Sequence, residues 1–257
     1  MSTRSTSKIA GFDARPTHPL RTAAARARRR KAAAILASAI CLDLFAAGAA
    51  SAEGAASPRA AQVQAPPPSR AGGADFLGAP ASSDARQIAD WVIRAGDNRG
   101  MPFVIVDKKG AKVFVFNGGG QLIGATSALL GLARGDDSAP GVGDRELSQI
   151  RPDERTTPAG RFVASLGYGL GSQDILWVDY ASALALHRVL PANTREHRLE
   201  RLAAASPLDR RITFGCINVP AGFYDRVVQP AFTGTSGVVY ILPEIKSLSE
   251  VFRTSAS

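Results

Sequence analysis

Residues 211–220 read RITFGCINVP and place a cysteine, Cys216, between a glycine and a short apolar run. The other cysteine of the chain, Cys41, lies in a basic and alanine-rich N-terminal segment. If that segment is removed during export, Cys216 is the sole thiol and has no partner for an internal disulfide. A lone thiol in an oxidising compartment is prone to oxidation, so two interpretations stay open: a small buried apolar residue, or a reactive nucleophile.

The N-terminal segment has the features of an export signal. The basic run RTAAARARRRK (21–31) is followed by the apolar run AAAILASAI and by small residues up to Ala52. This order predicts a secretory signal peptide over 1–52, cut after Ala52. The apolar run is short for a bilayer span, and Asp43 interrupts its continuation. We therefore expect a periplasmic or cell-envelope protein that meets the membrane only through this signal.

The strongly basic balance of the chain comes mostly from the same segment. The whole chain has a formal net charge of +9, but nine of its 31 Lys+Arg and two of its 22 Asp+Glu lie in 1–52. Residues 53–257 therefore carry a net charge of only +2. A balance this close to neutral gives no reason to expect a nucleic-acid partner.

Two further regions follow the signal. Residues 53–82 include APPPSRAGG, lack periodic apolar residues and predict a disordered Ala/Pro/Gly linker. Residues 83–257 have the length of one domain. The first element of this domain is a helix over DARQIADWVIRAG, which we expect Ser83 to cap. Its apolar face is formed by Ile88, Trp91, Val92 and Ala95.

The pattern then changes to short β-rich runs, which predict a mainly β domain with a few peripheral helices. FVIVD (103–107) and KVFVFN (112–117) are separated by a hairpin signal, and GVVYILP (237–243) is the last strand. The other expected strands are QLIGATSALLG, GRFVASLGYG, DILWVDY and SALALHRV. Helices are expected over 194–206 and 221–232, the latter limited by Pro230.

A cluster of aspartates lies in ARGDDSAPGVGD (133–144), at Asp136, Asp137 and Asp144. Three aspartates are compatible with a calcium site, but their spacing does not fit an EF-hand loop. The glycine and proline content favours an exposed turn.

Cys216 needs a base if it is to act as a nucleophile, because an unassisted thiol is mostly protonated at neutral pH. Residues 53–257 hold two histidines, His187 and His197. His187 ends the strand-like run ALALH, where a sheet would fix its ring. His197 lies in the charged helical run REHRLERLAAAS, which is typical of a solvated surface. His187 is the favoured base and His197 the alternative.

The neighbours of Cys216 fit the same chemistry. Gly215 permits a close approach of the backbone to a substrate. The N–H groups of Gly215 and Cys216 would stabilise the oxyanion formed when a carbonyl is attacked. A helix beginning after Pro220 would favour a thiolate near its start. A tight Gly-Cys turn within a core strand remains the alternative.

ITFGCINVP resembles the signature of the L,D-transpeptidases, the family with a YkuD-type catalytic domain. Thr213, Gly215, Cys216, Ile217 and Asn218 follow the order of that signature. ERTTPAGRF (154–162) resembles the family's Thr-Pro-x-Gly segment, and VIVDKKGAKVFVFNGGGQLIGATSALLG resembles its opening hairpin. The resemblance spans about residues 102–243. Here the histidine precedes the cysteine, which distinguishes the chain from papain-like and NlpC-type peptidases.

The resemblance implies a YkuD-like β-sandwich-type fold and an enzyme that acts on peptidoglycan stem peptides. Cys216 would attack the stem peptide and release the terminal D-Ala, with His187 as general base and acid. The acyl group would pass to a second stem peptide, a lipoprotein lysine or water. Gly215 and Cys216 would provide oxyanion donors, and Asn218 a polar contact to the substrate. The family uses no metal and no organic cofactor.

Two departures from the family pattern matter. Phe214 stands where the family has a second histidine, so the ring beside the thiol carries no charge and no hydrogen-bond donor. The 28 residues between His187 and Cys216 exceed the family's separation, and His197 would give a more usual one. We interpret residues 191–210 as an inserted helical lid over the groove. Most arginines of this region are expected to be solvated, with stem-peptide carboxylates as alternative partners: Arg195, Arg198, Arg201, Arg210 and Arg211.

Three functions therefore remain in view. The first is an L,D-transpeptidase-type acyltransferase. The second is a catalytically silent peptidoglycan-binding protein of the same fold, which Phe214 favours. The third is an L,D-carboxypeptidase or other hydrolase that gives the acyl group to water; it shares the acyl-enzyme with the first.

Overall fold

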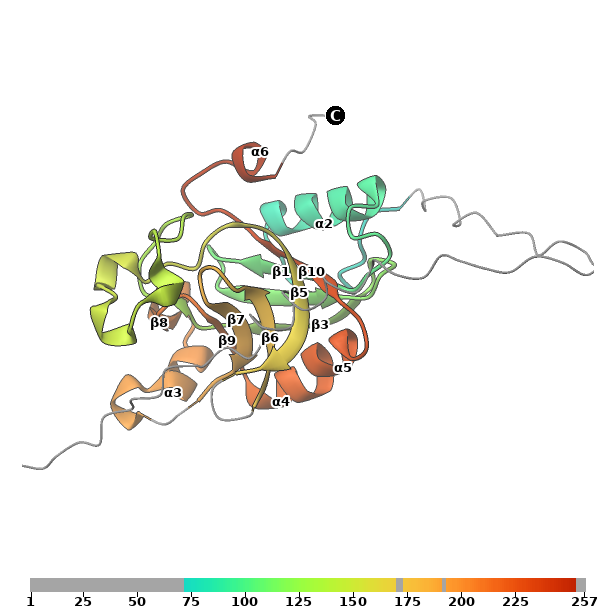
Figure 1. Cartoon of the computed structure of the whole chain (residues 1–257). Helices are drawn as coiled ribbons and strands as arrows, with labels where there is room; N and C mark the ends of the chain where they lie inside the picture. Colours follow the sequence, from blue (N-terminus) through green and yellow to red (C-terminus); the bar gives the residue numbers. More distant parts are fainter. Residues whose placement is uncertain (1–71, 170–172, 191–192, 253–257) are drawn as a thin grey trace, which may run out of the picture. The chain divides into compact units, whose positions relative to one another are not determined.

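The runs FVIVD and KVFVF form two neighbouring antiparallel strands of the main sheet in the computed structural model (Figure 1). The structure describes residues 72–169, 173–190 and 193–252, all within the unit that spans 66–257. The expected signal peptide over 1–52 lies outside the described residues. Within them, no helix combines the length and apolar content that crossing a bilayer requires.

The strands form one large and one small sheet in the described part of the chain. The large sheet has eight strands in the order β3-β2-β1-β10-β5-β6-β7-β9, and β4 pairs with β8 in a separate two-stranded sheet. The strands are β1 Phe103–Asp107, β2 Lys112–Phe116, β3 Leu122–Ser127, β4 Leu130–Gly131, β5 Gly160–Tyr168, β6 Asp174–Asp179, β7 Leu184–Arg188, β8 Arg211–Thr213, β9 Ile217–Val219 and β10 Gly237–Ile241. The prediction of a mainly β fold with few helices is confirmed.

Helical segments are short apart from the first. The α-helices are α2 Ser83–Ala95, α3 Arg198–Ala203, α4 Ala221–Phe223, α5 Gln229–Phe232 and α6 Leu248–Val251, with a π-helical stretch over Tyr224–Val228 between α4 and α5. Single 3₁₀ turns cover Val142–Asp144, Leu147–Gln149, Pro152–Glu154, Thr194–Glu196 and Pro207–Arg210.

The central strands are apolar on both sides because both sides of the sheet are covered. Phe103 and Ile105 of β1 pack with helix α2, whereas Val104 and Val106 pack with the α4–α5 segment. Successive side chains of a strand point to opposite faces, so a continuous apolar run is what a doubly covered strand needs. Figure 1 shows α2 and the α4–α5 segment on opposite sides of β1 and β10.

The sheet curls until its two ends approach one another. Leu129, just after β3, exchanges two backbone hydrogen bonds with Asn218 of β9, with N···O distances of 2.8 and 2.9 Å. Val113 of β2 and Val219 of β9 lie in the same buried core. The result is a nearly closed, sandwich-like assembly, and Asn218 lies on the seam that closes it.

The folded domain begins earlier than the sequence predicted. Residues 72–82 were assigned to the linker, but Asp75 pairs with Gln121 beside β3 and Phe76 is only 3% exposed. The Phe76 ring packs edge-on against Phe114 and Phe116. The expected boundary at residue 82 is therefore wrong for 72–82, because the Phe76 ring and the backbone hydrogen bonds of Asp75 dock this segment onto the domain.

Three local predictions also need correction. Ser82, not Ser83, caps helix α2, since its Oγ accepts a hydrogen bond from the Ala85 N–H. The predicted helix over 194–206 is shorter, because His197 adopts a left-handed conformation with φ of 49° and separates a 3₁₀ turn from α3. Pro230 does not end the second helix, which runs through it to Phe232.

Candidate functional site

The parallel pairing of β7 with β9 brings two predicted site residues together. His187 lies opposite Asn218 in the register, and the Asn218 Nδ2 is 3.0 Å from the His187 Nε2. Cys216 immediately precedes β9, and its Sγ lies 3.5 Å from the carbonyl oxygen of Ala183, the residue before β7. Cys216, His187 and Asn218 therefore share one edge of the sheet.

The hydrogen bonds of His187 fix its tautomer. Its Nδ1 lies 2.8 Å from the carbonyl oxygen of Arg188, and a carbonyl oxygen only accepts, so Nδ1 carries the proton. The neutral ring then has its lone pair on Nε2, where the Asn218 amide donates. Burial lowers the pKa of His187, which keeps the ring neutral near pH 7. Such a ring is ready to accept a proton at Nε2.

The orientation of Asn218 is fixed from its other side. The Arg198 Nη1 donates to the Asn218 Oδ1 at 2.7 Å, which directs the Nδ2 of the same amide toward His187. Glu196 in turn accepts a hydrogen bond from the Arg198 Nε. Asn218 is 1% exposed, whereas the Arg198 and Glu196 side chains are partly exposed, at 15% and 30%.

The Cys216 thiol is held in its protonated form. Burial raises the pKa of the Cys216 thiol, and the Ala185 N–H and the charge of Arg198 act in the opposite direction. Among the described residues, no hydrogen bond joins the thiol to a histidine, because the His187 Nε2 is occupied by Asn218. The site is thus a neutral thiol beside a neutral imidazole.

The backbone turn that presents Cys216 depends on Gly215. Its φ is +137°, and a Cβ at this position would lie 2.9 Å from the carbonyl oxygen of Thr156. The Thr213 Oγ1 accepts from the Gly215 N–H at 3.2 Å and donates to the Cys216 carbonyl at 2.7 Å. Of the two amides expected to bind an oxyanion, the Gly215 N–H is therefore already engaged within the turn. The Cys216 N–H has no acceptor among the described residues.

A small cavity of about 90 Å³ opens beside the thiol. Phe214 lies in its wall with Cys216, and the Arg155 guanidinium stacks on the Phe214 ring, 4.0 Å from its centre. A positive charge therefore stands next to the Phe214 ring. The lining residues are Ser138, Val142, Gly143, Arg145, Leu147, Ile150, Glu154, Thr156, Pro158, Ser182, Ala183, Leu184, Phe214, Gly215 and Cys216.

The sequence did not predict which segment forms the wall of this cavity. Residues 138–158 supply most of it, although part of this segment was interpreted as an exposed turn. Arg145 and Glu154 brace the segment, with the Arg145 Nη1 at 3.0 Å from both carboxylate oxygens of Glu154. The three consecutive 3₁₀ turns have no periodic apolar pattern, so the only signal available was the proximity of the segment to Thr157.

The inserted segment does not form the expected lid. None of residues 193–210 lines the cavity beside Cys216. His197 is directed to solvent: its side chain is 61% exposed and its Nδ1 lies 2.5 Å from Glu200. The structure therefore places His187, and not His197, on the strand that pairs with the residues following Cys216.

The five arginines have different surroundings. Arg210 and Arg211 are buried, which contradicts the expectation of solvated side chains. Arg210 donates to backbone carbonyl groups, and Arg211 pairs with Glu244 at 2.6 Å. Arg201 donates to the backbone carbonyl groups of residues 196 and 209, and Arg195 is exposed.

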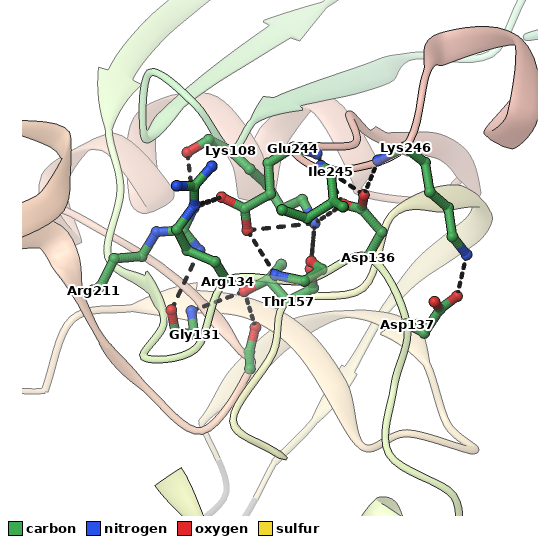
Figure 2. Close-up of polar contacts among 12 residues, drawn as sticks. Lys108, Gly131, Arg134, Asp136, Asp137, Thr157, Arg211, Glu244, Ile245 and Lys246 are labelled. Carbon is green, nitrogen blue, oxygen red and sulfur yellow. Dashed lines mark hydrogen bonds and ion pairs between the residues drawn. The ribbon is translucent and has the colours of Figure 1, made fainter. Parts of the chain in front are cut away.

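A buried ionic cluster, drawn in Figure 2, is hydrogen-bonded to the cysteine turn through Thr157. The Lys108 Nζ donates to Asp136 at 2.6 Å and to the Thr157 carbonyl at 2.9 Å. Thr157 then donates its hydroxyl to the Gly215 carbonyl at 2.7 Å. Glu244 completes the cluster by pairing with Arg211. A continuous chain of hydrogen bonds therefore runs from Lys108, just after β1, through Thr157 to the turn that carries the thiol.

The same cluster explains the aspartates of the 133–144 segment. Asp136 accepts the backbone N–H groups of residues 244, 245 and 246 in addition to Lys108, so its oxygens are fully used. Asp137 pairs with Lys246 at the surface. No group of three or more His, Cys, Asp or Glu side chains within residues 72–169, 173–190 and 193–252 is arranged to hold a metal.

The protein is thus a mainly β domain with a cysteine–histidine–asparagine site on one sheet edge. No protein-family model and no curated protein sequence matches the chain. Similar solved structures include an L,D-transpeptidase from Xylanimonas cellulosilytica, with 13% identity, a TM-score of 0.36, and coverage of 56% of this chain and 61% of that one. Another is an L,D-transpeptidase from Mycobacterium smegmatis, with 10% identity, a TM-score of 0.31, and coverage of 55% and 58%.

A third similar structure is the helical cell shape determining protein of Campylobacter jejuni, with 13% identity, a TM-score of 0.38, and coverage of 61% of this chain and 55% of that one. The matched region spans less than two thirds of each of these three proteins. Two of the three carry the name of the family that residues 154–162 and 211–220 resemble. Likeness at this level adds no weight to an assignment of activity.

Proposed function

We propose that the chain is an exported cysteine acyltransferase of the L,D-transpeptidase type that acts on peptidoglycan stem peptides. The observation that carries the proposal is the pairing of His187 with β9, which sets a proton-accepting ring nitrogen on the sheet edge that holds Cys216. The motif order around Cys216 and the predicted export signal supply the substrate class and the compartment, the periplasm or cell envelope.

In the first step the Cys216 sulfur attacks the carbonyl carbon of the diamino-acid residue that precedes the terminal D-Ala. Because both groups are neutral, the thiol proton moves to the His187 Nε2 as the sulfur–carbon bond forms. This requires the Asn218 amide to give up its hydrogen bond to Nε2, since that nitrogen has a single lone pair. The imidazolium then protonates the amine of D-Ala as the carbon–nitrogen bond breaks, and a thioester remains.

In the second step an amine attacks the thioester, loses its proton to His187 and releases the thiol. A second stem peptide or a lipoprotein lysine would serve as the amine, and water would give hydrolysis instead. The Cys216 N–H is the available oxyanion donor in each step, because the Gly215 N–H is bonded to Thr213. Phe214 would border the substrate, and Thr213 shapes the turn. Asn218, which was expected to contact the substrate, is buried and does not line the cavity, so its role is to orient His187.

The second candidate is a catalytically silent peptidoglycan-binding protein of the same fold. One observation favours it: burial keeps the thiol protonated, and no hydrogen bond links it to His187 within the described residues. In this function the cavity beside Phe214 would hold a stem peptide without reacting.

Intact-protein mass spectrometry separates these functions. The purified protein is incubated with a disaccharide tetrapeptide or a carbapenem, and a covalent adduct is sought. Acyl transfer predicts an adduct that Cys216→Ala abolishes and His187→Gln slows, whereas His197→Gln, the matched control, leaves it unchanged. The complete lack of an adduct, with stem-peptide binding retained, would identify the silent binder. Chromatography of the products distinguishes cross-linked dimers from trimmed stems.

A further inference from the structure

We infer that Arg198 is the positioning residue of the site: it orients Asn218, and through it His187, and supplies the positive charge that Phe214 lacks. This inference concerns the same site as the proposed function and deepens it. Arg198 comes from the segment that interrupts the family pattern, so the insertion would provide part of the catalytic machinery and not a lid.

The orienting role follows from hydrogen-bond directions. A guanidinium only donates, so the Asn218 atom 2.7 Å from the Arg198 Nη1 must be the amide oxygen. The Asn218 nitrogen is then the atom directed to His187, where it donates to Nε2. Without Arg198 the amide loses the contact that distinguishes its two ends, and a flipped amide would present its oxygen to Nε2. That arrangement favours a proton on Nε2 and removes the base.

Arg198 is itself held in place. Its Nε donates to Glu196, two residues earlier in the same segment, and its side chain is only 15% exposed. Asn218 is in turn anchored by backbone hydrogen bonds to Leu129 across the seam of the sheet. Both partners of the Arg198–Asn218 contact are therefore fixed by the fold, as a positioning contact requires.

The charge of Arg198 acts on both reacting groups. It lowers the pKa of Cys216 and of His187 in the same way that any nearby cation favours a thiolate and disfavours an imidazolium. Glu196, which accepts a hydrogen bond from the Arg198 Nε, neutralises part of this charge.

Other charges near the site are already paired. Arg188, next to His187, binds Asp174 and Asp225. On the cavity side of Cys216, Arg145 pairs with Glu154. The remaining cation on that side, Arg155, stacks on the Phe214 ring and donates to the Ile150 carbonyl. Arg198 is distinguished from all of these by its direct contact with the partner of His187.

The test measures the pH dependence of Cys216 alkylation by iodoacetamide, together with the ¹⁵N chemical shifts of the His187 ring. Arg198→Met should slow alkylation at neutral pH by about three- to tenfold, with the profile moved to higher pH. It should also change the ring shifts from the Nδ1–H tautomer toward a mixture. Arg195→Met is the matched control, since it removes an exposed arginine three residues away and should change neither readout.

Arg198→Gln separates the orienting role from the charge. The glutamine amide is uncharged but keeps a hydrogen-bond donor for Asn218. We expect the tautomer to be retained and the alkylation to stay slow. Thermal unfolding of each variant shows whether it is folded, and if Arg198→Met is not, Arg198→Gln alone decides. A wild-type alkylation profile in the folded variant overturns the inference. Neither readout uses a stem peptide, so the inference stands or falls independently of acyl transfer.

Discussion

Thr157 donates its hydroxyl to the carbonyl of Gly215 at 2.7 Å, across 58 residues of sequence. The same hydroxyl accepts from the Gly131 N–H, so Thr157 joins the cysteine turn to β4. Thr157→Val keeps the shape and leaves both buried backbone groups without a partner. We expect the free energy of unfolding to fall by about 1–3 kcal/mol.

Urea denaturation measures this loss, and Cys216 alkylation by iodoacetamide reports whether the turn has shifted. Thr126→Val, on strand β3, is the control and should change the free energy of unfolding little. Equal stability of Thr157→Val and the wild type would show that the turn does not depend on this hydroxyl.

Gly215→Ala should damage both folding and reactivity. The φ of +137° is unfavourable for a residue with a Cβ, and the added methyl would lie 2.9 Å from the Thr156 carbonyl oxygen. We expect a loss of at least about 2 kcal/mol in the free energy of unfolding. Gly234→Ala, at φ +74° with no atom within 4 Å, measures the cost of a positive φ without a steric contact. Similar losses for the two variants would contradict the predicted contact.

Asp136 should make the protein sensitive to acid. Burial alone would raise the pKa of Asp136, but Lys108 and three backbone N–H groups lower it to about 2 from its ordinary 3.8. A carboxyl group whose pKa is lower in the folded state stabilises fully above pH 3.8, and this stabilisation is lost as the pH falls toward 2. The contribution is about 2 kcal/mol.

Urea denaturation at a series of pH values tests this expectation. Asp136→Asn should be less stable at neutral pH, because it leaves Lys108 buried with a weaker partner, and should lack this acid-dependent loss. Asp137→Asn is the control, since Asp137 pairs with Lys246 at the surface. An unaltered acid dependence in Asp136→Asn would show that another carboxyl group is responsible.

The Cys216 thiol should lose its proton at a higher pH than a thiol in water does. Burial raises its pKa above the ordinary value of 9.0, so the alkylation rate should still be rising beyond that pH. In urea, where the thiol is hydrated, the midpoint should return to the ordinary value. A midpoint well below 9.0 in the folded protein would instead indicate a thiolate–imidazolium pair and would contradict proton transfer between two neutral groups.

Phe76→Ala tests where the domain begins. The ring is 3% exposed and packs between Phe114, Phe116 and the Arg86 guanidinium. Its removal should cost about 3–5 kcal/mol in the free energy of unfolding, measured by urea denaturation. The neighbouring Leu77 is 60% exposed, so Leu77→Ala should have little effect. If the two variants are equally stable, residues 72–82 act as a linker after all.

The sheet was predictable because its signal is local. Apolar runs such as FVIVD exceed what a singly covered strand needs, and the KKGA turn between the first two strands is short enough to specify their pairing. The docking of Phe76 was not predictable, because a single aromatic residue in a Pro- and Ala-rich segment has no periodicity. Its contact depends on a groove formed by residues about 40 positions later.

The site was predictable in part for the same reason. His187 could be favoured over His197 because a strand fixes a ring better than a charged, solvated segment does. The wall contributed by 138–158 and the contact of Arg198 with Asn218 arise only from the three-dimensional fold. The arginine pattern around 195–211 carries no information on which guanidinium is buried and which is hydrated.

The seam between Leu129 and Asn218 separates a rigid part of the site from an adaptable one. Since Asn218 closes the sheet with its backbone and orients His187 with its side chain, β9 is unable to move toward a substrate without opening the fold. In the proposed function, adjustment to differently shaped peptides would then come from the opposite wall, residues 138–158. Exchange of that segment during evolution would change the peptide accepted while Cys216 and His187 stay where they are.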